Sequence, residues 1–195
     1  MSKLQPIDLL RLIYRHLDFE SLLRGNPSLK KENVEEFFKR LASLLGEGVP
    51  MPHREDVIVS CDGSSRGNPG DAGIGIVVAD AGGRSIIEKG KYIGRATSNV
   101  AEYKAAIFAL EEAKRLGARR VTLRADSELL VRQVRGEYRV RNAALARLYA
   151  ELMAALKSFD EVKIEQVPRE ENTIADSLAT AAADPAALRR GRGDS

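Results

Sequence analysis

Four acidic side chains stand at points of the chain where a fold can aim them at one place. Asp62 follows a β-branched apolar run that is typical of a buried strand, and Asp126 closes a second such run. Glu102 and Asp176 each fall in the first turns of a predicted helix. A carboxylate beside a buried strand is costly unless it meets a cation. Together the four acids predict a site for a hard divalent metal, and hence phosphate chemistry.

Each acid taken alone also has a structural explanation. Asp62 suits a turn that bonds to backbone amides, and Asn99 with Glu102 fits a capping box. Asp126 suits a helix cap, and Asp176 a solvated position. The joint pattern favours function, because Asp62 and Asp126 end strands that the topology can place side by side and parallel. Both side chains then leave the same edge of the sheet, where open α/β sheets bind their ligands.

The chemistry of the four acids narrows the choice of metal. Carboxylates held within several ångströms of one another repel, and each raises the pKa of the others. A divalent cation removes that penalty. Oxygen-only ligation suits Mg²⁺ or Mn²⁺ rather than Zn²⁺. The single cysteine, Cys61, excludes an internal disulfide and argues against a thiolate cluster.

The elements that must position these acids follow from the alternation of apolar runs and turn residues. This alternation predicts the order βββαβααβα. Strands separated by helices imply parallel pairing through right-handed crossovers, so we expect an α/β fold with a mixed five-stranded sheet flanked by helices. The expected strands are 55–62, 73–79, 85–93, 120–125 and 161–167, and the expected helices are 99–116, 127–135, 140–158 and 172–183.

The composition of the chain changes near residue 50. Apolar residues at helical spacing predict a small helical module over 1–45. Glycine and proline between 46 and 54 predict a linker, and the α/β domain follows over 55–183. The basic tail, 184–195, is predicted to be disordered.

Bulk composition excludes several classes of protein. The 195 residues are 44% hydrophobic and 30% charged, which is ordinary for a soluble globular protein. The net charge of +3 and the isoelectric point of about 9.0 are compatible with a polyanionic partner. No apolar stretch approaches the roughly 18 residues of a membrane helix. Asp8 and Arg11 interrupt the apolar N-terminus, so we expect no signal peptide, no membrane contact and a cytoplasmic location.

The motifs that carry the four acids resemble type 1 ribonuclease H. They occur in the family's order and on the matching order of elements, over residues 55–183. The motifs are Asp62-Gly63-Ser64 with Gly67-Asn68-Pro69-Gly70, Thr97-Ser98-Asn99-Val100-Ala101-Glu102-Tyr103, Ala125-Asp126-Ser127, and Glu171-Asn172-Thr173-Ile174-Ala175-Asp176.

The resemblance implies an endoribonuclease that hydrolyses the RNA strand of RNA–DNA hybrids and leaves 5′-phosphate and 3′-hydroxyl ends. Two Mg²⁺ ions, replaceable by Mn²⁺, would be held by Asp62, Glu102, Asp126 and Asp176. A hybrid presents a wide minor groove with 2′-hydroxyls on one strand. The residues implied to contact it are Gly63, Ser64, Asn68, Ser98, Asn99 and Arg169.

Two features depart from the family pattern. Many relatives carry a histidine in the loop before the last aspartate, whereas 167–172 has none, and His16 and His53 lie outside the matching region. Some relatives also carry an additional helix with a basic loop, whereas here 134–142 runs almost directly into the next helix. The basic residues left in this segment are candidates for phosphate contact or plain solvated charge: Arg135, Arg139 and Arg141.

Alternatives remain open at this point. One is a nuclease of broader specificity that also cuts double-stranded RNA. Another is a non-catalytic nucleic-acid-binding module on the same fold. Clustered acids near the phosphates argue against it, because they would not add to the affinity of such a module for nucleic acid. The module over 1–45 fits either a nucleic-acid-binding role or a packing or dimerising role.

Overall fold

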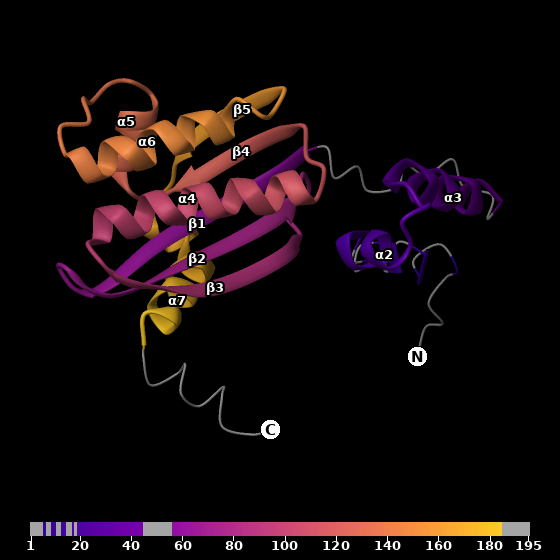
Figure 1. Cartoon of the computed structure of the whole chain (residues 1–195), viewed down its shortest axis with the longest axis horizontal. Coiled ribbons are helices and arrows are strands. Elements are labelled where there is room, and N and C mark those ends of the chain that lie inside the picture. Colours follow the sequence, from indigo (N-terminus) through magenta and orange to yellow (C-terminus); the bar gives the residue numbers. More distant parts are fainter. Residues whose placement is uncertain are drawn as a thin grey trace. The chain divides into compact units, whose positions relative to one another are not determined.

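The structure is a computed structural model that describes residues 6, 9–10, 13–14, 17, 19–44 and 56–184. The chain divides into two compact units, Met1–His53 and Arg54–Ser195 (Figure 1). The predicted linker, 46–54, lies outside the described residues. So does the predicted basic tail beyond Asp184.

The larger unit has the predicted order of elements and one additional 3-10 turn, η1. Its sheet has the strand order β3-β2-β1-β4-β5, with antiparallel pairs on one side of β1 and parallel pairs on the other. The predicted mixed five-stranded α/β fold is therefore confirmed. The elements are β1 (Asp56–Gly67), β2 (Gly70–Asp80), β3 (Ser85–Ala96), α4 (Ser98–Arg115), β4 (Arg120–Ala125), α5 (Glu128–Val134), α6 (Ala143–Leu156), β5 (Glu161–Gln166), η1 (Arg169–Glu171) and α7 (Thr173–Ala182).

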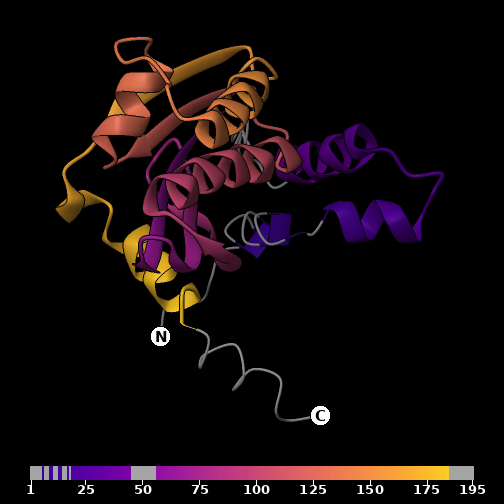
Figure 2. The same cartoon turned by 60° about the vertical axis from the view of Figure 1, so that its left-hand side comes forward.

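Helices cover both faces of the sheet (Figures 1 and 2). Helix α4 packs on β1 and β2 and lies beside α6, whereas α7 packs on β2 with further contacts to β1 and β3. Three alternate residues of β1, Val57, Val59 and Cys61, are buried in the main core together with residues of α4. Buried alanines of α4, among them Ala101 and Ala105, let the helix lie close to the strands.

The first strand is longer than the sequence pattern predicted. It continues from Asp62 to Gly67 and pairs with β2 as far as the couple Gly67↔Gly70. Only Asn68 and Pro69 are left between β1 and β2, because small side chains after Asp62 allow the ladder with β2 to continue. The ladder between β1 and β4 stops at Cys61↔Ala125, so Asp62 does stand at the edge of the parallel part of the sheet.

Two helix caps differ from those suggested as structural explanations for Glu102 and Asp126. Thr97, rather than Asn99, caps α4, and its side chain accepts a hydrogen bond from the backbone N–H of Val100. Ser127, rather than Asp126, caps α5. In both helices a hydroxyl one or two positions from the suggested residue accepts from one free backbone amide. The carboxylates of Glu102 and Asp126 are therefore not needed for capping.

The smaller unit has a core of its own. It contains α2 (Phe19–Gly25) and α3 (Lys31–Leu44). Tyr14, Val34 and Phe38 are buried together, with the rings of Tyr14 and Phe38 5.1 Å apart. The part of the predicted helical module before residue 18 lies largely outside the described residues. No helix in the described parts of the two units has the length and apolarity to cross a bilayer.

Candidate active site

Three of the four predicted acids meet at one end of the sheet. Asp62, Glu102 and Asp126 each present a carboxylate oxygen within 4.8 Å of the other two. They come from β1, from the second turn of α4 and from the residue after β4. The parallel pairing of β1 with β4 brings Asp62 beside Asp126, as the sequence predicted.

Two glycines let the helices that carry the remaining acids approach the strands. A Cβ atom on Gly63 would lie 2.2 Å from the backbone of Ala101 and Glu102, so only glycine lets α4 pack this close to β1. Likewise, a Cβ atom on Gly75 would lie 2.0 Å from the carbonyl oxygen of Ala175, in the first turn of α7. Gly63 therefore has a packing role in addition to any role toward substrate.

Burial and mutual repulsion raise the pKa values of Asp62 and Glu102. Asp62 is only 6% exposed. Desolvation, followed by the charges of Asp126 and Asp176, raises the pKa of Asp62 from 3.8 to about 7. Desolvation also raises the pKa of Glu102 well above its usual value, and the charges of Asp62 and Asp126 raise it further. The cluster is thus an environment that disfavours three bare negative charges.

The cluster fits a divalent cation. The Oε2 atom of Glu102 is buried and has no hydrogen-bond partner among the described residues. A buried carboxylate oxygen without a partner is expensive, and a cation bound between the three carboxylates would supply what it lacks. All the available donors are oxygens, which is the donor set that Mg²⁺ and Mn²⁺ prefer.

Asp176, the fourth predicted ligand, has a different partner. Its Oδ1 accepts a hydrogen bond of 2.6 Å from Nη2 of Arg169, and it stands outside the group of three. Asp176 still lines the same cleft and raises the pKa of Asp62, so it lies close to the cluster.

The predicted substrate contacts fall into two sets. Gly63, Ser64, Ser98 and Arg169 line the cleft that contains the acids. Asn68 does not line it, but its Oδ1 accepts a bond of 3.4 Å from the backbone N–H of Ser98 and so supports the rim. In contrast, Asn99 is exposed on α4 and lies outside this lining.

Sequence reasoning gave no role to several residues of the site. Ser65 and Ser127 also line the cleft. Ser65 lies beyond residue 62, where the first strand was predicted to end, and Ser127 is a recognisable cap signal. Asn172 is 2% exposed and bonds to Asp126 at 3.3 Å. Because Asn172 stands where a helix begins, its sequence context indicates a helix cap and not a contact with Asp126.

The basic segment before α6 lies apart from the cleft lining. Arg135 donates a hydrogen bond of 2.9 Å from its Nη2 atom to the carbonyl oxygen of Ile164. The carbonyl oxygen of Arg139 accepts from the buried side chain of Gln133. These bonds order the segment, and contact with phosphate stays a prediction for Arg135, Arg139 and Arg141.

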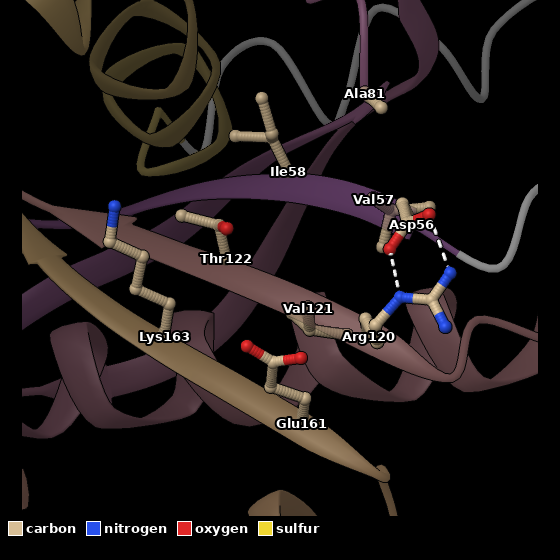
Figure 3. Close-up of a pocket in the computed structure, with 9 residues that line it drawn as sticks. All are labelled: Asp56, Val57, Ile58, Ala81, Arg120, Val121, Thr122, Glu161 and Lys163. Carbon is tan, nitrogen blue, oxygen red and sulfur yellow. Dashed lines mark hydrogen bonds and ion pairs between the residues drawn. The ribbon is translucent and has the colours of Figure 1, made fainter.

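A second cleft lies at the opposite end of the parallel strands, where Asp56, Arg120 and Glu161 begin β1, β4 and β5 (Figure 3). Arg120 bonds through two nitrogens to the carboxylate of Asp56. Lys163 forms an ion pair of 2.7 Å with Glu165. Within this cleft Asp56 and Arg120 thus pair with each other, and Lys163 pairs with an acid outside the lining.

The fold and the cluster define a class: a mixed α/β sheet with an acidic, oxygen-only site at the edge of its parallel strands. A family model described as "Reverse transcriptase-like" matches residues 60–182. The chain belongs to the ribonuclease H-like family, and the resemblance to type 1 ribonuclease H is confirmed.

Three similar proteins illustrate the relationship. The chain is 44% identical over 132 residues to the bifunctional protein Rv2228c of Mycobacterium tuberculosis, covering 67% of this chain and 36% of that protein. It is 43% identical over 125 residues to ribonuclease HI of Halobacterium salinarum, covering 64% of this chain and 63% of the relative. A structure of LC11-RNase H1 in complex with an RNA/DNA hybrid has a TM-score of 0.63 and 40% identity, covering 67% of this chain and 98% of the other. The chain therefore spans about a third of the mycobacterial relative.

Proposed function

We propose that this protein is a metal-dependent endonuclease that hydrolyses the RNA strand of RNA–DNA hybrids and leaves 5′-phosphate and 3′-hydroxyl ends. The observation that carries the proposal is the meeting of Asp62, Glu102 and Asp126 within 4.8 Å, with one buried Glu102 oxygen unpartnered in the described structure. Membership of the ribonuclease H-like family supports the same chemistry.

Asp62, Glu102 and Asp126 would hold divalent ions, with Asp176 as a further ligand once it is released from Arg169. Two bound Mg²⁺ ions would supply an activated water and stabilise the leaving 3′ oxygen. The chain's own contribution is to fix the carboxylates on rigid elements. Close seating of α4 against Gly63 sets the position of Glu102.

The cleft also supports a preference for hybrids. Ser64 and Ser98 are short polar side chains that line the same cleft as the acids. Such groups suit the 2′-hydroxyls of a shallow minor groove. Arg169 is exposed at the cleft and offers a positive charge to phosphate. None of these residues is arranged to read base edges, so we expect little dependence on sequence.

The test is cleavage of labelled duplexes by the purified full chain. We expect an RNA–DNA hybrid to be cut in Mg²⁺, double-stranded RNA and DNA to survive, and EDTA to stop the reaction. Asp126→Asn should abolish cleavage and retain hybrid binding. Asp160→Asn is the matched control, because Asp160 is an exposed acid paired with Arg119.

The outcomes separate the alternatives. Equal cleavage of double-stranded RNA would favour the nuclease of broader specificity. Hybrid binding without cleavage in any metal would favour the non-catalytic module. Full turnover in chelator, or full activity of Asp126→Asn, would refute the proposed mechanism.

A further inference from the structure

Asn172 occupies the N-cap position of α7, yet its side chain makes no capping bond to that helix. Asn142, at the N-cap of α6, behaves in the ordinary way. Its Oδ1 accepts from the backbone N–H groups of Ala144 and Leu145 at 2.9 and 3.1 Å. Asparagine is favoured at caps because its side-chain oxygen satisfies free amides. Asn172 therefore uses its amide group for something else.

The side chain of Asn172 points into the acid cluster. Its Nδ2 donates to the carbonyl oxygen of Cys61 at 3.0 Å and to Oδ1 of Asp126 at 3.3 Å. Cys61 directly precedes Asp62, so both bonds end on segments that carry acids of the cluster. The residue is only 2% exposed, so little water competes for these bonds.

The backbone of Asn172 connects the remaining part of the site. Its N–H donates to the carbonyl oxygen of Arg169, and its own carbonyl oxygen accepts from the N–H of Asp176, both at 3.0 Å. One residue thus links β1, the end of β4 and the segment that carries the Arg169–Asp176 ion pair.

This arrangement costs stability. The Oδ1 atom of Asn172 is buried and has no hydrogen-bond partner in the part of the chain that the structure describes. Helix α7 also lacks a side-chain cap. A buried unpartnered oxygen and an unmade cap are both unfavourable. Local rules are most often broken in this way where a functional site requires it.

We propose that Asn172 is a positioning residue that holds the Asp126 carboxylate toward Asp62 for metal binding. The inference rests on the proposed function, because that function assigns the two acids to a metal. Asn172 acts through Asp126. Without the amide donor, the Asp126 carboxylate is free to turn away from its neighbours. Loss of a partner that orients a metal ligand typically weakens metal affinity by about 10- to 100-fold.

The experiment is calorimetric titration of MnCl₂ into the substrate-free full chain, followed by steady-state cleavage of a hybrid. We expect Asn172→Ala to weaken Mn²⁺ binding by about 10-fold or more. The kcat should fall at a fixed low metal concentration, and the KM for hybrid should stay unchanged. Asn172→Ser keeps one donor hydrogen. It should also weaken Mn²⁺ binding and lower kcat, but by smaller factors than Asn172→Ala. This variant decides the question if Asn172→Ala does not fold.

The matched control is Asn142→Ala, which removes a true cap. It should lower the thermal midpoint and leave Mn²⁺ affinity unchanged. Wild-type affinity in folded Asn172→Ala or Asn172→Ser, or an equal loss in Asn142→Ala, would overturn the inference. A wild-type chain that neither binds Mn²⁺ nor cleaves hybrid would instead refute the proposed function.

Discussion

Arg169 and Asp176 form an ion pair in which Nη2 and Oδ1 lie 2.6 Å apart. This bond holds the fourth predicted metal ligand outside the group formed by the other three acids. The Arg169 side chain is 74% exposed, so nucleic acid can reach it. Its charge also lowers the pKa of Asp62 and of Glu102, against the larger effects that raise them.

Replacing this arginine should move metal binding and substrate binding in opposite directions. Arg169→Ala removes a positive charge beside the cation site and frees Asp176, so Mn²⁺ binding to the substrate-free protein should tighten severalfold at about pH 8.5, where the Asp62 carboxyl is ionised. The KM for hybrid should rise, because a phosphate contact is lost. Calorimetry and steady-state kinetics measure the two effects.

Arg119→Ala is the control for this prediction. Arg119 forms an exposed ion pair of 2.6 Å with Asp160 just before β4 begins, at the opposite end of that strand from Asp126. Neither the Mn²⁺ affinity nor the KM for hybrid should change in this variant. Weaker Mn²⁺ binding in Arg169→Ala would contradict the assigned role of the arginine.

The raised pKa of Asp62 predicts how the metal-free protein responds to pH. Its folded value of about 7 lies above the ordinary 3.8. The folded state therefore binds this proton more tightly than the unfolded state does. Its contribution to stability is complete below about pH 4 and is lost as the pH rises through about 7. At about 1.4 kcal/mol per pKa unit, the loss has an upper bound of about 4 kcal/mol.

Thermal unfolding in EDTA tests this expectation. The midpoint of the wild type should fall between about pH 5 and about pH 8, and Mg²⁺ should reverse the fall because the cation replaces the proton. Asp62→Asn should flatten the dependence in EDTA and be the more stable protein at the higher pH. The variant Asp160→Asn, at an exposed acid, should keep the wild-type dependence. A midpoint of the wild type that rises with pH in EDTA would disprove the argument.

The sequence predicted the meeting of Asp62 and Asp126 because their positions depend on strand order alone. Both follow buried runs, and the connection between those runs forces parallel pairing, which the couple Cys61↔Ala125 confirms. The place of Glu102 near the other two acids was predicted because it falls near the start of a helix. The small residues around it let α4 approach the sheet.

The features that were not predicted depend on contacts that the local sequence does not specify. The bond from Asn172 to Asp126 spans 46 positions, and the local sequence around Asn172 indicates an ordinary cap. The ladder with β2 extended β1 into a stretch rich in turn residues. The pairing of Asp176 with Arg169 depends on how η1 folds back toward α7. Periodicity and propensity describe local preference, so they do not contain these outcomes.

Substitution of Gly63 tests whether close packing of α4 against β1 fixes the position of Glu102. In Gly63→Ala the new Cβ atom would meet the backbone carbon of Ala101 and the backbone nitrogen of Glu102 at 2.2 Å. A backbone cannot move aside as a side chain can, so helix and strand must separate. We expect a loss of about 1–3 kcal/mol in the free energy of unfolding. Displacement of Glu102 should also raise the Mg²⁺ concentration needed for half-maximal activity.

Urea unfolding and a Mg²⁺ titration of the cleavage rate measure these effects. Gly83→Ala is the control, because Gly83 has a φ of +79° and a Cβ atom there would meet nothing within 4 Å. It should cost about 1 kcal/mol through backbone strain and leave the Mg²⁺ requirement unchanged. Wild-type metal dependence in Gly63→Ala would show that the close packing of α4 against Gly63 does not determine the position of Glu102.

Deleting residues 1–53 should separate catalysis from the smaller unit. All four acids lie in the larger unit, whose core contains fully buried residues such as Val59 and Ile76, so kcat should be unchanged. We expect the KM for hybrid to rise, because the smaller unit presents basic side chains such as Arg24 and Lys30 to solvent. The difference in KM should shrink in high salt, since phosphate contacts release counterions. An unchanged KM, with light scattering showing a dimer for the full chain and a monomer for the deletion variant, would instead assign self-association to this unit. A lost kcat would show that the larger unit cannot act alone.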